Sequence, residues 1–169
     1  EQDFKITAEQ LEKAITPKTK MLILCSPSNP TGSVYNKEEL SELAEVIKRH
    51  EDVIVVADEI YEHINYVGKH ESIAQFPGMK ERTIVVNGVS KAYAMTGWRI
   101  GYIAAPEWIV KGCNKLQGQY TSGPCSISQK AAVAAYTIDQ GPVEEMRQAF
   151  ERRRNLIVEL TSKIEGLEV

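Results

Sequence analysis

Four short apolar segments recur along the chain, separated by polar and charged stretches. Met21–Cys25, Val53–Ala57 and Thr83–Val86 are rich in β-branched or aliphatic residues. Such continuous apolar runs are typical of strands buried on both faces of a parallel sheet. The fourth segment, Ile100–Ala105, follows after about a dozen residues, which is short for a helical crossover. We therefore predict that it runs antiparallel to the third strand, beyond a turn at Asn87-Gly88.

Helical periodicity fills the segments between and after these strands. A capping box at Thr7–Gln10 begins the first predicted helix, and Asn36 with Glu39 begins the second. The predicted fold class is α/β, with a mostly parallel sheet, flanking helices and one antiparallel strand. Further helices are predicted over residues 107–118, over the alanine-rich and tightly packed segment 126–138, and over 143–164 after a break at Gly141-Pro142.

Composition excludes several classes of partner. The chain has 169 residues and a net charge of -3, so we expect no nucleic-acid partner. No apolar run approaches membrane-spanning length, so no membrane partner is expected. The three cysteines, Cys25, Cys113 and Cys125, form no C-x-x-C pair, so neither a disulfide framework nor a metal site is predicted, and Cys25 is expected in the core. This composition fits a reducing cytoplasm, where we expect the protein to act.

The two ends of the sequence have an unusual form for a whole protein. The chain begins at Glu1 without a methionine and stops at Val169, where an apolar pattern is beginning. We interpret it as a piece of a longer chain, so the lack of a signal peptide carries no information about targeting.

Polar side chains stand directly after the three predicted parallel strands. Asn29 follows the first strand, Asp58 and Tyr61 follow the second, and Ser90 and Lys91 follow the third. Ligands of open α/β sheets bind beyond the carboxyl ends of the strands. We therefore expect these side chains to meet in one cleft, where they would supply an amide, a carboxylate, a phenol, a hydroxyl and an amine.

Lys91 is the most informative of these residues. Lysine is rarely buried without a partner, and partial burial in general makes a lysine amine a usable nucleophile. Arg99 follows eight residues later and adds a planar cation that can grip phosphate oxygens with two parallel hydrogen bonds.

Each of these residues also has a purely structural explanation when it is taken alone. Asn29 precedes a proline and can form a turn. Asp58 and Ser90 could each cap a helix, and Tyr61 could belong to the core. The combination of these groups at neighbouring strand ends favours a functional site.

Three motifs resemble those of a known family. They are S-N-P-T-G at residues 28–32, A-D-E-I-Y at 57–61, and S-K at 90–91 followed by G-W-R at 97–99. These motifs are similar to those of class I and II aminotransferases, pyridoxal-phosphate enzymes of fold type I, and most similar to bacterial-type aspartate aminotransferases. Members of the family are much longer. The resemblance implies that residues 1–141 are part of the pyridoxal-phosphate-binding large domain and that 142–169 are the long helix leading towards a small domain.

The resemblance also implies three catalytic residues. Lys91 would bind pyridoxal phosphate covalently and then serve as general base and general acid, which requires a neutral amine. Asp58 would keep the pyridine nitrogen protonated, a pairing that is typical of these cofactor sites. Tyr61 would hydrogen-bond the phenolic oxygen of the cofactor. Six residues are thereby implied to bind the cofactor: Asn29, Asp58, Tyr61, Ser90, Lys91 and Arg99, with Asn29 at the phenolic oxygen and Ser90 and Arg99 at the phosphate.

The implied reaction moves an amino group between an amino acid, with aspartate favoured, and a 2-oxo acid, in a homodimeric enzyme. The arginine that grips the substrate carboxylate lies outside this stretch, so we expect the chain alone to lack transaminase activity. C–S lyases, aminocyclopropane-carboxylate synthases and aromatic aminotransferases share these motifs and remain alternatives. A nucleotide-binding domain is disfavoured because the chain contains neither G-x-G-x-x-G nor a P-loop motif. A folded but catalytically idle module remains open for the chain by itself.

Overall fold

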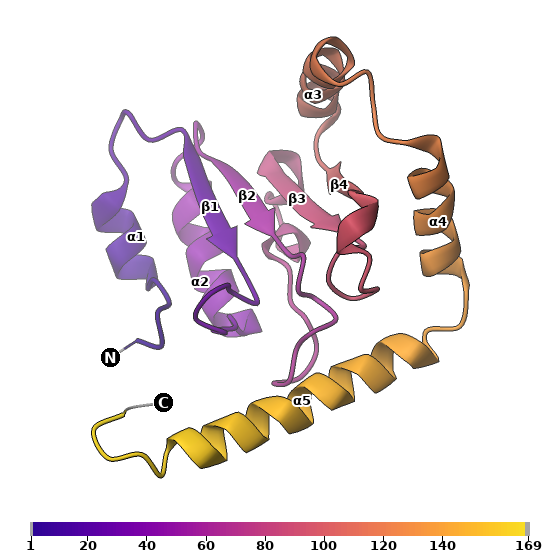
Figure 1. Cartoon of the computed structure of the whole chain (residues 1–169). Coiled ribbons are helices and arrows are strands. Elements are labelled where there is room, and N and C mark those ends of the chain that lie inside the picture. The colour runs from indigo at the N-terminus through magenta and orange to yellow at the C-terminus, as the bar shows by residue number, and fades with distance from the viewer. Residues whose placement is uncertain (1, 168–169) are drawn as a thin grey trace.

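A four-stranded sheet forms the centre of the computed structural model, which describes residues 2–167 (Figure 1). The strand order is β1-β2-β3-β4, in which β1 pairs with β2 and β2 with β3 in parallel, whereas β3 and β4 are antiparallel. The predicted α/β class and the antiparallel fourth strand are confirmed. The strands are β1 (Met21–Cys25), β2 (Ile54–Asp58), β3 (Thr83–Gly88) and β4 (Gly101–Ala104).

Strand β3 continues two residues beyond its predicted end. Asn87 and Gly88, which were expected to form a turn, pair with Tyr102 and Gly101 of β4. A Cβ atom on residue 88 would lie 2.8 Å from the backbone oxygen of Ile100, so glycine permits this close pairing. The predicted turn was wrong because strand pairing outweighs the turn preference of the dipeptide.

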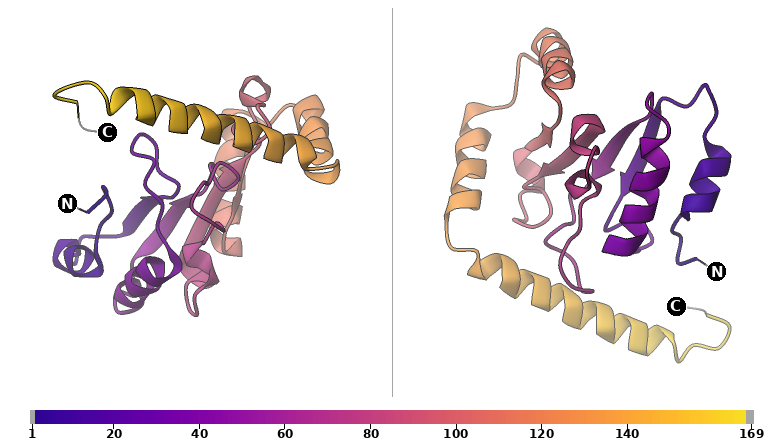
Figure 2. Two further views of the ribbon diagram at one scale, coloured as in Figure 1. Left: turned by 90° about the horizontal axis from the view of Figure 1, so that it is seen from below. Right: turned by 180° about the vertical axis from the view of Figure 1, so that it is seen from behind.

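Helices α1 and α2 lie side by side on one face of the sheet and enclose the main core (Figure 2). Both helices begin at the predicted capping boxes. Leu40 and Leu43 of α2 are buried in one cluster with Val55 of β2, so the apolar stripe of α2 faces the sheet as its periodicity predicts. The bounds are α1 (Ala8–Ala14) and α2 (Lys37–Lys48).

The other face of β1 is open. Met21 and Ile23 are 50% and 71% exposed, whereas Leu24, the β1 residue in the main core cluster, is buried. Strand β1 is an edge strand of this sheet, so the prediction of burial on both faces was wrong. Cys25, predicted as a core residue, is half-buried.

The C-terminal helices extend around the sheet more loosely (Figure 1). Helix α4 lies beside β4 and buries only Ser128, Ala132 and Ala135, so the prediction of a tightly packed helix was wrong. Helix α5 runs past the carboxyl ends of the parallel strands, and Pro142 lies in its first turn instead of preceding it. Among the described residues, no helix is both long and apolar enough to cross a membrane. The remaining bounds are α3 (Glu107–Tyr120), α4 (Ser126–Thr137), α5 (Gly141–Thr161), and the short 3-10 helices η1 (Ile73–Gln75), η2 (Lys80–Arg82) and η3 (Thr96–Trp98).

Candidate functional site

The three parallel strands end at one edge of the sheet. Cys25 at the end of β1 is in register with Asp58 at the end of β2, and Asp58 is in register with Val86 of β3. The loops that leave these strand ends therefore start side by side. This is the position at which ligands of open α/β sheets bind.

The loop after β1 carries Asn29 on a compact turn. The backbone N–H of Gly32 donates to Ser28, whose own N–H donates to Ser33, both at 2.9 Å. Gly32 has a φ of 75°, which a glycine adopts without steric cost. The buried hydroxyl of Ser26 accepts from the backbone N–H of Tyr35 at 3.1 Å and closes the base of the loop. The peptide bonds before Pro27 and Pro30 are both cis.

The loop after β2 carries Asp58 and Tyr61. Asp58 is half-buried, and its Oδ1 accepts from the backbone N–H of Ile60 at 3.3 Å. A turn follows Asp58, and not the helix that this residue could have capped.

A buried carboxylate braces this second loop. Glu59 is 6% exposed, the hydroxyl of Ser72 donates to its Oε1 at 2.5 Å, and Nε2 of His70 lies 2.9 Å from its Oε2. Ligand-type atoms of Glu59, Glu62 and His70 lie within 4.8 Å of one another, but the bonds from His70 and Ser72 already satisfy the Glu59 carboxylate. We therefore interpret the cluster as a structural brace. Sequence reasoning missed it, although a carboxylate next to a buried strand signals a buried partner.

Tyr61 is the central contact of the predicted site. Nδ2 of Asn29 donates to the Tyr61 hydroxyl at 3.4 Å. Nζ of Lys91 lies 5.5 Å from the centroid of the Tyr61 ring. Because the hydroxyl accepts from Asn29, its own O–H remains able to donate to a ligand.

Ser90 and Arg99 are joined through Thr96. The Thr96 hydroxyl donates to the backbone oxygen of Ser90 at 3.0 Å, and Nη1 of Arg99 donates to the backbone oxygen of Thr96 at 3.0 Å. Arg99 adopts a left-handed conformation with a φ of 54° and is exposed. One of its five N–H donors is used in this bond. Thr96 was missed by sequence reasoning, because a hydroxyl in an irregular loop gives no pattern.

Two ionisable side chains next to Tyr61 perturb each other. Nε2 of His63 lies 3.3 Å from Oε1 of Glu62. This interaction raises the pKa of His63 and holds the pKa of Glu62 below its usual value. The interaction therefore favours the charged form of both side chains.

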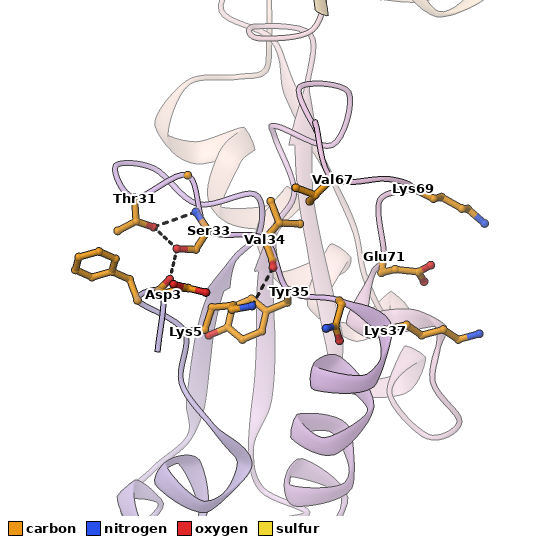
Figure 3. A pocket seen from close by; sticks show the side chains of 13 residues that line it. Asp3, Lys5, Thr31, Ser33, Val34, Tyr35, Lys37, Val67, Lys69 and Glu71 are labelled. Carbon is orange, nitrogen blue, oxygen red and sulfur yellow. Dashed lines mark hydrogen bonds between the residues drawn. The ribbon is translucent and has the colours of Figure 1, made fainter. Parts of the chain in front are cut away.

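A separate hollow of about 680 Å³ lies beside the loop after β1 (Figure 3). Its wall is formed in part by Thr31, Ser33 and Tyr35, with Val67 and Lys69 from the loop after β2. Figure 3 shows the Lys69 side chain pointing away from the hollow. None of the six predicted site residues lines it, so we do not assign the cofactor to this hollow.

The structure brings three of the six predicted residues, Asn29, Tyr61 and Lys91, into contact. Asn29 and Lys91 both approach Tyr61, Asp58 ends the strand before Tyr61, and Ser90 precedes Lys91. This donor set matches the chemistry of pyridoxal phosphate: an amine for its aldehyde, a carboxylate for its ring nitrogen and hydrogen-bond donors for its phenolic oxygen. Hydroxyl and guanidinium groups that can hold a phosphate lie at the Ser90 end. The residues therefore fit the cofactor.

The fold and this donor set are chemically compatible with an α/β protein that takes a phosphorylated carbonyl compound at its strand ends. The family model described as "Aminotransferase class I and II" matches residues 1–169. The chain belongs to this family.

Individual relatives agree with the family assignment. The chain is 54% identical to an aspartate aminotransferase of Geobacillus stearothermophilus, over 96% of this chain and 42% of that protein. It is 50% identical to a bifunctional aspartate aminotransferase and glutamate/aspartate-prephenate aminotransferase of Petunia hybrida, over 99% of this chain and 36% of that protein. The crystal structure of an aspartate aminotransferase from Rhizobium meliloti superposes with a TM-score of 0.94 at 48% identity, over 96% of this chain and 41% of that one. The chain thus spans about two fifths of the length of these relatives.

Proposed function

We propose that this chain is part of a pyridoxal-phosphate-dependent aminotransferase that transfers an amino group between aspartate and a 2-oxo acid. The observation that carries the proposal is the placement of the Lys91 amine beside Tyr61, which itself accepts a hydrogen bond from Asn29, at the carboxyl edge of the sheet. Similarity to aspartate aminotransferases from several organisms supports aspartate as the amino donor.

Lys91 would act through its Nζ atom. It is the one amine among the six proposed site residues, so it would anchor the cofactor and then carry a proton between substrate atoms. Pyridoxal phosphate, when bound, supplies an electron sink that stabilises negative charge on the substrate. The ring of Tyr61, 5.5 Å from Nζ, would limit the positions that the flexible lysine side chain can occupy.

The other residues would bind and orient. Asp58 would hold a proton on the cofactor's ring nitrogen through charge pairing. Tyr61 would donate its O–H to the phenolic oxygen while Asn29 holds the Tyr61 hydroxyl in place, since Asn29 already donates to it. Ser90 and Arg99 would bind the phosphate, with the N–H groups of Arg99 that its bond to Thr96 leaves available.

The remaining features of the proposal concern the larger enzyme. Residues 1–141 would belong to the cofactor-binding large domain, and 142–169 would lead towards a smaller domain. Helix α5, which occupies Gly141–Thr161, supports this division. We further propose a homodimeric, cytoplasmic enzyme that takes an amino acid and a 2-oxo acid as substrates. The chain by itself would lack transaminase activity, because it spans about two fifths of its relatives.

The proposal is tested by chemical trapping in the full-length protein that carries this sequence. Pyridoxal phosphate is added, the visible absorption band is recorded, the sample is reduced with borohydride, and the labelled peptide is identified by mass spectrometry. We expect the label on Lys91, and we expect Lys91→Ala to lose the band and to lower turnover by about a hundredfold or more, because a proton-transfer group is removed.

Lys20→Ala is the matched control, because Lys20 is an exposed lysine that pairs with Asp52 at the surface. It should retain both the band and the label. Label spread over surface lysines, or a normal band in Lys91→Ala, would overturn the assignment of Lys91. Turnover of aspartate with 2-oxoglutarate, compared with turnover using prephenate as amino acceptor, separates aspartate transfer from the wider activity named for the Petunia hybrida relative.

A further inference from the structure

The loops that carry Tyr61 and Lys91 meet a second time, two residues further along each loop. The first contact places Lys91 Nζ 5.5 Å from the Tyr61 ring. The second is an edge-to-face contact between His63 and Tyr93, with ring centroids 6.1 Å apart and planes at 71°. Two consecutive contacts therefore connect the same pair of loops.

Tyr93 also contacts helix α4 and the residue that precedes α5. Its ring makes an edge-to-face contact with Tyr136, with centroids 5.1 Å apart and planes at 70°. Its hydroxyl donates to Oε1 of Gln140 at 2.9 Å. The Nε2 group of Gln140 in turn donates to the backbone oxygen of Ile138 at 2.7 Å. The ring of Tyr93 thus contacts both His63 in the loop after β2 and Tyr136 in α4, and we call these contacts the Tyr93 clamp.

The backbone joins Tyr93 rigidly to Lys91. The N–H of Ala94 donates to the backbone oxygen of Lys91 at 3.1 Å, and Ala94 has a φ of 52°. The N–H of Met95 donates to Val89, which is completely buried. Lys91 and Tyr93 therefore lie in one tight turn, and a displacement of the Tyr93 ring would move this turn together with Lys91.

We infer that Tyr93 is a positioning residue for Lys91: its ring, which contacts both His63 and Tyr136, fixes the place of Lys91 beside Tyr61. The functional consequence rests on the proposed function. Reacting groups must be held to within about 0.5 Å of their productive geometry, and a lysine on a flexible four-carbon stem needs such support more than a rigid side chain does. Tyr93 itself touches neither substrate nor cofactor in this role.

The test compares Tyr93→Leu with Tyr93→Phe in the full-length protein loaded with pyridoxal phosphate. The Phe variant keeps both ring contacts and loses the bond to Gln140, whereas the Leu variant loses all three. We expect Tyr93→Leu to lower kcat about tenfold with little change in KM, because a misplaced reacting group slows the chemical step. The visible circular dichroism per bound cofactor reports how rigidly a chromophore is held. It should fall about twofold or more in Tyr93→Leu, because the productive geometry tolerates a displacement of only about 0.5 Å. Tyr93→Phe should stay close to the wild type.

A second variant separates positioning from general loss of stability. Leu43→Ala removes a buried side chain from the other core cluster, so it destabilises the protein without touching the Tyr93 clamp. At a temperature where all variants are folded, its circular dichroism per bound cofactor should equal that of the wild type. Equal signals in Tyr93→Leu and the wild type, or an equal fall in Leu43→Ala, would overturn the inference. Absence of cofactor label on Lys91 in the wild type would overturn the proposed function and, with it, the inference.

Discussion

Helices α2 and α5 both have apolar positions in their sequences, yet they lie in different surroundings. Helix α2 buries five of its residues against the sheet and α1. Helix α5 is longer, and none of its 21 residues, all of which the structure describes, is buried. Phe150, Ile157 and Leu160 of α5 remain 44%, 60% and 53% exposed. Periodicity therefore predicts which face of a helix is apolar, but not whether a second surface covers that face.

The contrast between the helices extends to how each is stabilised. Helix α2 combines a capping box with burial of Leu40, Leu43 and Ile47. Helix α5 is stabilised by polar contacts on its surface: Arg147 forms ion pairs with Glu144 at 2.8 Å and with Glu151 at 2.9 Å. The Arg147 side chain is 22% exposed and its two partners are 52% and 31% exposed, so solvent reaches both pairs and each contributes little. The free energy of folding should therefore come mainly from the half of the molecule that contains α1, α2 and the parallel strands.

The sharpest test of this comparison removes one leucine from each helix. Leu43→Ala should lower the free energy of unfolding by about 2–5 kcal/mol, because it leaves a cavity in a closed core. Leu160→Ala should change it by less than about 0.5 kcal/mol, because Leu160 is half exposed and alanine is a good helix former. Urea denaturation of the wild type and both variants measures the difference.

A large effect of Leu160→Ala would contradict the comparison and would mean that the apolar face of α5 is covered in solution. Repeating the denaturation at several protein concentrations would then show whether another copy of the chain covers it, because only association makes the midpoint depend on concentration.

A third variant tests the junction between the parallel strands and β4, where Gly88 of β3 pairs with Gly101 of β4. A Cβ atom there would lie 2.8 Å from the Ile100 oxygen and 2.9 Å from the Gly101 Cα. Both are backbone atoms of the β4 side, so Gly88→Ala should force the strands apart and cost about 1–3 kcal/mol. Gly112→Ala in α3 is the matched control: nothing lies within 4 Å of its added Cβ, and alanine should stabilise the helix slightly. Thermal denaturation compares them, and faster hydrogen exchange in β4 would locate the damage.

Features set by local residues could be predicted from the sequence, whereas features set by tertiary contacts could not. The capping box at Asn36 and the antiparallel direction of β4 could be predicted, because they depend on local residues and on the length of a connection. The pairing of Asn87 with Tyr102 could not be predicted, because a local turn preference competes there with a tertiary contact. Loose packing of α4 was missed for a related reason: its alanine content shows that close packing is possible but not that a partner surface is present.

Ligands of open α/β sheets bind beyond the carboxyl ends of the strands, and the candidate site shows what this rule can and cannot predict. The rule predicted that Asn29, Tyr61 and Lys91 would come together, because parallel strands end at the same edge. It could not predict the contact between His63 and Tyr93, which are thirty residues apart. That contact depends on irregular loop geometry, including the left-handed conformation of Ala94, and no periodic pattern encodes such geometry.

The smallest expected effect concerns the ion pair at the edge of the Tyr93 clamp. The interaction with Glu62 raises the pKa of His63, and the same interaction lowers the pKa of Glu62. A histidine with a raised pKa in the folded state stabilises the protein fully below its unfolded value of about 6.5, and this contribution is lost as the pH rises through the folded pKa. A carboxylate with a lowered pKa contributes above its unfolded value of about 4.3 and loses this contribution as the pH falls through its folded pKa. The pair therefore contributes most between these two limits.

His63→Gln should remove this dependence. The stability difference between the wild type and His63→Gln should be largest near pH 5.5, between the unfolded-state pKa values of glutamate, about 4.3, and histidine, about 6.5, and should shrink as the pH approaches 8. Because the His63 side chain is 43% exposed, solvent screening should keep the difference below about 1 kcal/mol. Urea denaturation at matched pH values measures it, and taking differences cancels the other titrating groups. Glu62→Gln should give the same dependence of the stability difference on pH. If the two side chains act as one pair, the double variant should be no less stable than either single variant. A difference that grows from pH 6 to pH 8 would contradict the assigned pairing, because it would require a His63 that stabilises the fold in its neutral form.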